Sequence, residues 1–307
     1  MSPVTSREPS AAGPDGAQAI ATLRDQQELD GVFACTRKER QISRAGSPYL
    51  TIELADSTGS ITARAFSDAD VLAGRFERGE LVRVRGQVER YREQLQVNVT
   101  TIARAEGAQA DPAEFLPKAY RDLDELEGFL EHLAREVYDP PLKLLLDGLL
   151  ADERLRPELR RAPCSVPGAR TGAHHAYLGG LLEHTVGVAT LAHELCALHP
   201  RLDRDLLLCA AIVHDLGKTR EFTYGAEIAR SEEGRMLGHV ELGLRVIAPH
   251  VPHALPEPRR LALEHCVLLH HGPDGARGTR FASAEALALH RLNALDAQVK
   301  GAFEQGL

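Results

Sequence analysis

The sequence of 307 residues contains no tryptophan, and aromatic residues make up only 5% of it. A surface that stacks on planar ligands must therefore be built from a small number of Tyr and Phe side chains. The sequence also lacks any CxxC pair, because its five cysteines stand far apart. This spacing argues against a disulfide scaffold and a cysteine-based zinc site, and it predicts reduced thiols in a cytoplasmic protein.

No apolar run is long enough to cross a membrane. The longest run near the middle, Leu206–Val213, is far short of the roughly 20 residues that a membrane-spanning helix needs. Residues 1–17 are rich in Pro, Ser, Gly and Ala and lack the hydrophobic stretch of a signal peptide. We therefore expect a disordered tail over 1–17 and no association with membranes.

A basic excess, which would suggest nucleic-acid binding, is also missing, since the net charge is −8. Residues 22–104 nevertheless carry 13 Lys and Arg against 12 Asp and Glu, so the acidic excess lies in the rest of the chain. Bound cations can invert the local field of an acidic domain. The charge balance therefore excludes neither a nucleic-acid binder nor a phosphate-hydrolysing enzyme.

Histidine is distributed very unevenly. No histidine precedes His132, and 13 of the 14 lie between His174 and His290. The length favours two domains, and this break places the chemistry in the C-terminal two thirds.

The N-terminal part shows the period-two pattern of strands. Apolar and polar residues alternate through 49–54, 61–66, 82–88 and 94–99, with turn residues between the runs. One short helical stretch is expected near 68–76. The pattern predicts a five-stranded OB barrel over residues 18–106.

Aromatic and basic side chains occupy the face of these strands opposite the apolar stripe. Bases stacked on aromatic rings and phosphates met by Arg are the usual way in which OB folds bind single strands. The alternative is a solvated strand face with aromatic residues packed under a loop. The predicted nucleic-acid-binding residues are Tyr49, Arg64, Phe66, Arg83, Arg85 and Tyr91.

Residues 107–119 are expected to form a linker, because they contain Gly107, Pro112 and Pro117. From residue 120 to 307 the apolar spacing is helical, with breaks at Pro and Gly. We expect six to eight helices and a short hairpin within 221–235. The predicted fold class is therefore multidomain β + α: an OB barrel followed by an all-α domain.

The strongest single feature is His214-Asp215, which directly follows an apolar helix. Polar groups in such a place need partners, and a divalent cation satisfies both. Imidazole nitrogen with carboxylate oxygen suits Mn, Fe, Zn or Ni better than Ca. Lys218 follows His214 by four residues, so on a helix it shares that face and could reach a phosphate. The alternatives are a satisfied core pair and a lysine that only complements a helix end.

Other elements follow in a fixed order along the chain. His184, His214-Asp215 and the late Asp296 resemble the metal-binding residues of the HD phosphohydrolase superfamily. The longer string HHAYLGGLLEHT over 174–185, with HDLGK at 214–218, LGH at 237–239 and HHG at 270–272, resembles the YhaM-type 3′-to-5′ exoribonucleases. Those proteins also carry an N-terminal OB domain, so the resemblance spans about residues 20–305.

The resemblance implies two metal sites and a preference for manganese. The first ion would be held by His184, His214, Asp215 and Asp296. The second would be held by Asp215, which bridges the ions, and by His239 and His270, with His271 assisting. Lys218 would stabilise charge on the phosphate. His175, ahead of His174, would orient the phosphate or protonate the leaving oxygen, and Glu183 could orient a ligand imidazole.

The sequence therefore predicts a metal-dependent 3′-to-5′ exonuclease acting on single-stranded RNA, with single-stranded DNA as a further substrate. Two alternatives stay open at this point: an HD phosphohydrolase or phosphodiesterase acting on small nucleotides, and a non-catalytic single-strand-binding protein. A homo-oligomer is allowed but not required.

Overall fold

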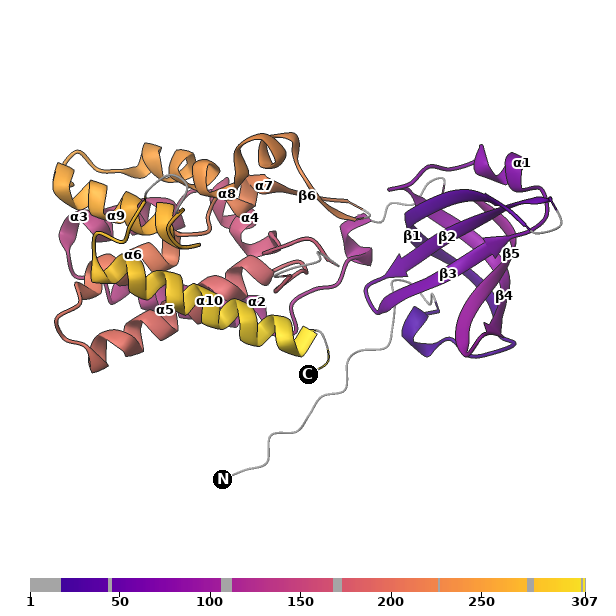
Figure 1. Cartoon of the computed structure of the whole chain (residues 1–307), viewed down its shortest axis with the longest axis horizontal. Coiled ribbons are helices and arrows are strands. Elements are labelled where there is room, and N and C mark those ends of the chain that lie inside the picture. Colours follow the sequence, from indigo (N-terminus) through magenta and orange to yellow (C-terminus); the bar gives the residue numbers. More distant parts are fainter. Residues whose placement is uncertain are drawn as a thin grey trace, which may run out of the picture. The chain divides into compact units, whose positions relative to one another are not determined.

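The computed structural model describes residues 18–43, 46–105, 112–167, 173–225, 227–274, 279–304 and 306. The predicted tail over 1–17 and residues 107–111 of the predicted linker lie outside the described residues. The chain divides into two compact units (Figure 1). The first ends at Pro117 and also includes Tyr224–Glu227, and the second comprises Lys118–Thr223 and Ile228–Leu307.

The first unit is a closed barrel with the strand order β1-β2-β3-β5-β4. The pairs are antiparallel except for β3 with β5, which run parallel. The five-stranded OB barrel predicted from the alternation is confirmed. Its elements are η2 (Ile20–Thr22), β1 (Glu28–Ile42), β2 (Pro48–Asp56), β3 (Gly59–Ala65), α1 (Ala69–Ala73), β4 (Leu81–Tyr91), β5 (Gln94–Arg104) and η3 (Pro112–Phe115).

Alternation explains why these strands close into a barrel. Leu50, Ile52 and Leu54 are all buried in the interior, while the intervening residues are only partly buried. The register shifts between Arg85 and Gly86. A Cβ at Gly86 would lie 2.3 Å from the carbonyl oxygen of Asn98, so only glycine lets β4 approach β5 this closely.

The second unit is helical, with one hairpin formed by β6 (Phe222–Tyr224) and β7 (Ile228–Arg230), which confirms the hairpin predicted there. The described residues form nine α-helices in this unit, one more than the upper end of the predicted range. The difference arises because a separate four-residue helix, α7, follows the His-Asp pair. The helices are α2 (Leu123–Arg135), α3 (Pro140–Leu150), α4 (Leu155–Arg161), α5 (Gly180–Leu198), α6 (Arg204–Val213), α7 (Lys218–Glu221), α8 (Glu232–Ile247), α9 (Glu257–Leu269) and α10 (Ala284–Glu304), with the 3-10 turn η4 (Ala248–His250).

Helix α6 lies at the centre of this unit, in contact with α5, α9 and α10 (Figure 1). Its residues Leu206–Val213 are all buried, as their uniform apolarity predicts. Asp203 caps the start of α6 by accepting from the backbone N–H of Leu206 at 3.0 Å. The buried helix therefore delivers whatever follows Val213 into the interior of the domain.

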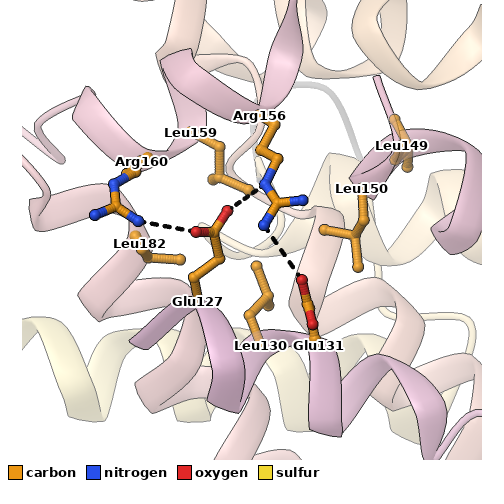
Figure 2. Close-up of a pocket in the computed structure, with 9 residues that line it drawn as sticks. All are labelled: Glu127, Leu130, Glu131, Leu149, Leu150, Arg156, Leu159, Arg160 and Leu182. Atoms are coloured by element: carbon orange, nitrogen blue, oxygen red, sulfur yellow. Dashed lines mark hydrogen bonds and ion pairs between the residues drawn. The ribbon is translucent and has the colours of Figure 1, made fainter. Parts of the chain in front are cut away.

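Helices α2 and α4 are joined by an ion-pair network over a small apolar pocket (Figure 2). Glu127 accepts from Arg156 at 2.5 Å and from Arg160 at 2.9 Å. The pocket beneath is only about 20 Å³, room for little more than one water. This network joins α4 to α2, and the chain continues from the end of α4 into the segment that carries Cys164.

Among the described residues, no helix combines the length and the apolarity that crossing a membrane requires.

Candidate metal centre and nucleic-acid face

The His-Asp pair lies at the buried end of α6. The His214 side chain is fully buried, and its Nδ1 donates to the carbonyl oxygen of Ala211 at 2.8 Å. That hydrogen bond leaves the Nε2 lone pair free to bind a ligand. Nε2 lies 3.3 Å from His184 Nε2 and 3.4 Å from Asp215 Oδ2.

Two glycines bring α8 against this pair. A Cβ at Gly217 would lie 1.9 Å from the carbonyl oxygen of His239 and 2.4 Å from the nitrogen of Gly243. Gly238 leaves helical geometry at φ 72° and ψ 162°, a region that is almost exclusive to glycine. The close approach and the kink place His239 Nε2 3.5 Å from Asp215 Oδ1.

Three of the four residues predicted to hold a first metal, His184, His214 and Asp215, are brought together, and the fourth, Asp296, reaches this cluster only through His184. His184 from α5 lies with its Nε2 3.5 Å from Asp215 Oδ2, and donors of His184, His214 and Asp215 all lie within 4.8 Å of one another. Asp296 from α10 reaches His184 from the other side, with Oδ2 2.6 Å from Nδ1. Asp296 therefore contacts the opposite ring nitrogen from the one that faces Asp215.

The residues predicted for a second metal also converge. Donors of Asp215, His239, His270 and His271 lie within 4.8 Å of one another. His270 is fully buried, its Nδ1 donates to the Val267 carbonyl at 2.6 Å, and its Nε2 lies 3.4 Å from Asp215 Oδ1. His239 Nε2 and His271 Nε2 approach to 2.8 Å. Two facing imidazole nitrogens need a proton or a cation between them.

One specific observation indicates that a divalent cation fits this arrangement. The Asp215 Oδ1 atom is buried and has no hydrogen-bond partner among the described residues. Such an oxygen is costly to bury unless something satisfies it. The nitrogen donors around it complete a mixed N and O set that suits Mn, Fe, Zn or Ni.

Burial keeps the imidazoles neutral and therefore able to bind a metal. It lowers the pKa of His174 and of His175 to about 3 and that of His270 to about 4. Burial alone would raise the pKa of Asp215, but its polar neighbours, with the Lys218 charge first among them, outweigh burial and hold that pKa well below its usual range. The centre therefore presents the Asp215 carboxylate beside imidazoles, such as that of His270, that are neutral at physiological pH.

Lys218 is buried and already has partners. Its Nζ lies 2.8 Å from Asp215 Oδ2 and donates to the Cys164 sulfur at 3.4 Å. The carboxylate of Asp215 outweighs burial and raises the pKa of Lys218. The lysine thus holds Asp215 in place, and its contact with a substrate phosphate stays a prediction.

A cleft of about 330 Å³ opens beside the centre. His174 lines it, whereas His175 does not. His175 is 2% exposed, adopts a left-handed φ of 48° and directs Nδ1 toward Asp296 Oδ2 at 3.9 Å. The geometry therefore favours His174 as the histidine that contacts a substrate in the cleft, whereas the sequence analysis favoured His175 for that role. The cleft is lined by Cys164, Ser165, Val166, His174, Lys218, Glu221, Phe222, Arg230, His239 and His271.

The expectation for Glu183 is wrong. Its carboxylate accepts from the Tyr177 hydroxyl at 2.7 Å and pairs with Lys300 at 3.2 Å. These contacts join α5 to the segment before it and to α10, and they do not orient a ligand imidazole. Glu221 does contact a candidate ligand imidazole, because its Oε2 lies 3.2 Å from His239 Nδ1.

Sequence reasoning missed Glu221, Cys164 and Asn293. Glu221 follows Lys218 by three residues, a helical spacing that could have identified it. Asn293 donates to the His270 carbonyl at 3.2 Å and lies 3.0 Å from His184 Nε2. Cys164 comes from a loop, where no periodic pattern signals its position.

The predicted nucleic-acid residues of the barrel divide into two groups. Tyr49 and Phe66 stack with ring centroids 5.5 Å apart, and the Arg64 guanidinium lies 5.3 Å from the Tyr91 ring centroid. Phe66 and Tyr91 are 50% and 45% exposed. The Arg64 Nε atom is buried without a hydrogen-bond partner among the described residues. This group combines exposed rings with an unsatisfied cation.

The second group consists of two arginines that already pair with an acidic side chain. Arg83 and Arg85 on β4 both pair with Asp30 on the neighbouring strand β1, at 3.0 Å and 2.9 Å. Their side chains are more than half exposed, so such pairs contribute little stability. A substrate phosphate would nevertheless compete with Asp30 for them.

Both units match known families. Residues 181–298 match the HD domain, and residues 35–104 match an OB-fold nucleic-acid-binding domain. The chain is 29% identical over 291 residues to the 3′-5′ exoribonuclease YhaM of Shouchella clausii strain KSM-K16, covering 92% of this chain and 88% of that protein. It is 28% identical to the YhaM of Oceanobacillus iheyensis, covering 89% and 85%.

Among solved structures, the second OB-fold domain of replication protein A from Methanococcus maripaludis matches with a TM-score of 0.25 and 18% identity, over 31% of this chain and 99% of that one. The resemblance read from the motifs is confirmed by the two domain matches and by similarity along nine tenths of the chain. The chain thus consists of an OB-fold domain followed by an HD domain and is similar to the YhaM-type exoribonucleases over most of its length.

Proposed function

We propose that this protein is a metal-dependent exonuclease that removes nucleotides from the 3′ end of single-stranded RNA. The observation that carries the proposal is the buried Asp215, whose orphan oxygen faces His239 and His270 beside a cleft of about 330 Å³. The relatives named as 3′-5′ exoribonucleases support the same activity over most of the chain.

In the proposed site, one ion is held by His184, His214, Asp215 and Asp296, and a second by Asp215, His239, His270 and His271. The bound metal supplies Lewis acidity and lowers the pKa of water for attack on the phosphodiester. Manganese is the proposed ion, with Fe, Ni and Zn as alternatives of similar donor preference. The free cysteines, all buried, support a proposed cytoplasmic location.

The chain's own side chains have separate tasks in this proposal. Lys218 keeps Asp215 ionised and fixed through its 2.8 Å contact. His174, a neutral imidazole in the wall of the cleft, donates one N–H to a substrate oxygen. Arg230, whose side chain is 61% exposed at the cleft, meets the backbone phosphate of an entering strand.

The barrel is proposed to capture the strand. Phe66 and Tyr91 offer exposed rings for bases, and Arg64 offers a guanidinium that lacks a hydrogen-bond partner at Nε among the described residues. Stacking of this kind is tolerant of sequence and of the sugar, so single-stranded DNA is a further proposed substrate.

The decisive experiment follows 5′-labelled single-stranded RNA with the purified full chain and Mn²⁺. We expect a ladder that shortens stepwise from the 3′ end. Asp215→Asn should abolish cleavage with RNA binding retained, whereas Asp147→Asn, at an exposed position of α3, should cleave normally.

Two outcomes would favour the alternatives. An intact oligomer together with hydrolysis of mononucleotides would point to a small-nucleotide enzyme. Binding without hydrolysis under every divalent metal would point to a single-strand-binding protein.

A further inference from the structure

We infer that Cys164, His174 and His184 form a separate site for a soft divalent cation, of the Zn²⁺ or Cd²⁺ type, which overlaps the proposed catalytic centre. Donor atoms of these three residues lie within 4.8 Å of one another, and all three side chains are buried. Cation binding at this site does not depend on the proposed function, but the inhibition of cleavage that it would cause rests on that function.

The two segments that supply Cys164 and His174 are held together by their backbones. The Cys164 N–H donates to the His175 carbonyl at 3.0 Å. The Ser165 hydroxyl oxygen accepts from the His174 N–H at 3.2 Å and lies 3.0 Å from its carbonyl oxygen. The thiol and the imidazole are therefore preorganised, and no rearrangement of the chain is needed to bring them together.

The site can be reached from the cleft, because Cys164 and His174 both line it. His184 lies behind them, and its ring centroid is 4.9 Å from that of His174. An ion that enters the cleft therefore meets the sulfur and the His174 ring before it meets the deeper histidines.

The donor chemistry selects the ion. One sulfur with two imidazole nitrogens suits zinc and cadmium, whereas harder ions such as Mn²⁺ favour oxygen. A fourth donor is near, since Asp215 Oδ2 lies 3.9 Å from the Cys164 sulfur. On binding, the S–H bond breaks, the sulfur bonds to the cation, and the proton is released to solvent. Lys218 then keeps its shorter contact, the one to Asp215.

His184 makes the two kinds of occupancy mutually exclusive. A neutral imidazole has one lone pair for a cation, since its other nitrogen carries a proton. His184 belongs both to this cluster and to the cluster with His214 and Asp215. A soft ion should therefore inhibit the Mn²⁺-driven reaction, and excess Mn²⁺ should relieve the inhibition.

The test is a Cd²⁺ titration of the metal-free full chain, followed by the ultraviolet thiolate-to-cadmium charge-transfer band. We expect the band in the wild type and in Cys196→Ser, whose sulfur lies in α5 outside the cluster. We expect it to be lost in Cys164→Ser and weakened in His174→Gln. Cys164→Ala provides a second thiol-free variant if the serine variant does not fold.

The inhibition is measured separately, as the Zn²⁺ concentration that halves RNA cleavage in Mn²⁺. This half-inhibitory Zn²⁺ concentration should rise by about tenfold or more in Cys164→Ser, because the variant has lost one ligand. A charge-transfer band that survives in Cys164→Ser, or its absence in the wild type, would overturn the site. If the chain cleaves no RNA, the band still decides the site by itself, so the two proposals fail separately.

Discussion

At the scale of single residues, the centre depends on how each imidazole is held by its second nitrogen. His214 and His270 donate Nδ1 to backbone carbonyls at 2.8 Å and 2.6 Å, so their Nε2 atoms face Asp215. His239 instead uses a side chain, the buried carboxylate of Glu221 at 3.2 Å. Carboxylate partners of this kind fix the tautomer and raise the basicity of a metal ligand.

Glu221→Gln should therefore weaken metal binding without removing a ligand. We expect the affinity for Mn²⁺, measured by calorimetry on metal-free protein, to fall about 10- to 100-fold. Excess Mn²⁺ should restore much of the RNA cleavage. Glu233→Gln is the matched control, because Glu233 is exposed and pairs only with Arg220 in the described interactions. Equal affinities in the wild type and Glu221→Gln would refute this role.

The residue scale also shows where sequence reasoning ends. The order of the motifs was enough to predict that His184, His214 and Asp215 lie together, with Asp296 beside His184. It could not show which nitrogen of His184 meets which carboxylate, because this depends on ring orientation in the packed domain. For the same reason it chose His175 over His174, since adjacency in the sequence does not reveal which ring faces a cleft.

At the scale of elements, the site depends on how closely α7 approaches α8. Helix periodicity predicted the long helices, because burial of an apolar stripe is a repeated signal. It did not predict the four-residue helix α7 or the kink at Gly238, because both are too short to show a period. Gly217 is the residue through which this contact can be tested.

Gly217→Ala should separate α7 from α8, because the new Cβ would lie 1.9 Å from the His239 carbonyl oxygen. Overpacking of this kind costs about 1–3 kcal/mol of unfolding free energy, and Mn²⁺ affinity should fall with it. Gly128→Ala is the control: Gly128 lies on the exposed face of α2 with nothing within 4 Å of the new Cβ, and the variant should gain about 0.5–1 kcal/mol of unfolding free energy. Thermal unfolding gives the stability of both variants. A Gly217→Ala variant that is as stable as the wild type would contradict the packing argument.

At the scale of the whole molecule, the chain combines a domain with nearly balanced charge and a domain that holds the acidic excess. The residues of the candidate metal centre all belong to the helical unit, so the proposed cleavage chemistry needs no residue of the barrel. The barrel would then affect capture of a long substrate but not the chemical step. This separation predicts different kinetic effects for variants in the two units.

The double variant Phe66→Ala, Tyr91→Ala should raise KM for long single-stranded RNA and leave kcat nearly unchanged. Loss of a base–aromatic stack costs about 1–3 kcal/mol, so we expect a rise of roughly tenfold or more for each stack lost. Cleavage of a dinucleotide should not change, because a substrate that short occupies only the cleft. Arg83→Gln with Arg85→Gln should have a smaller effect, since Asp30 already pairs with both arginines. Equal losses on long RNA and dinucleotide would mean that the barrel residues act on the fold or the centre and not on capture.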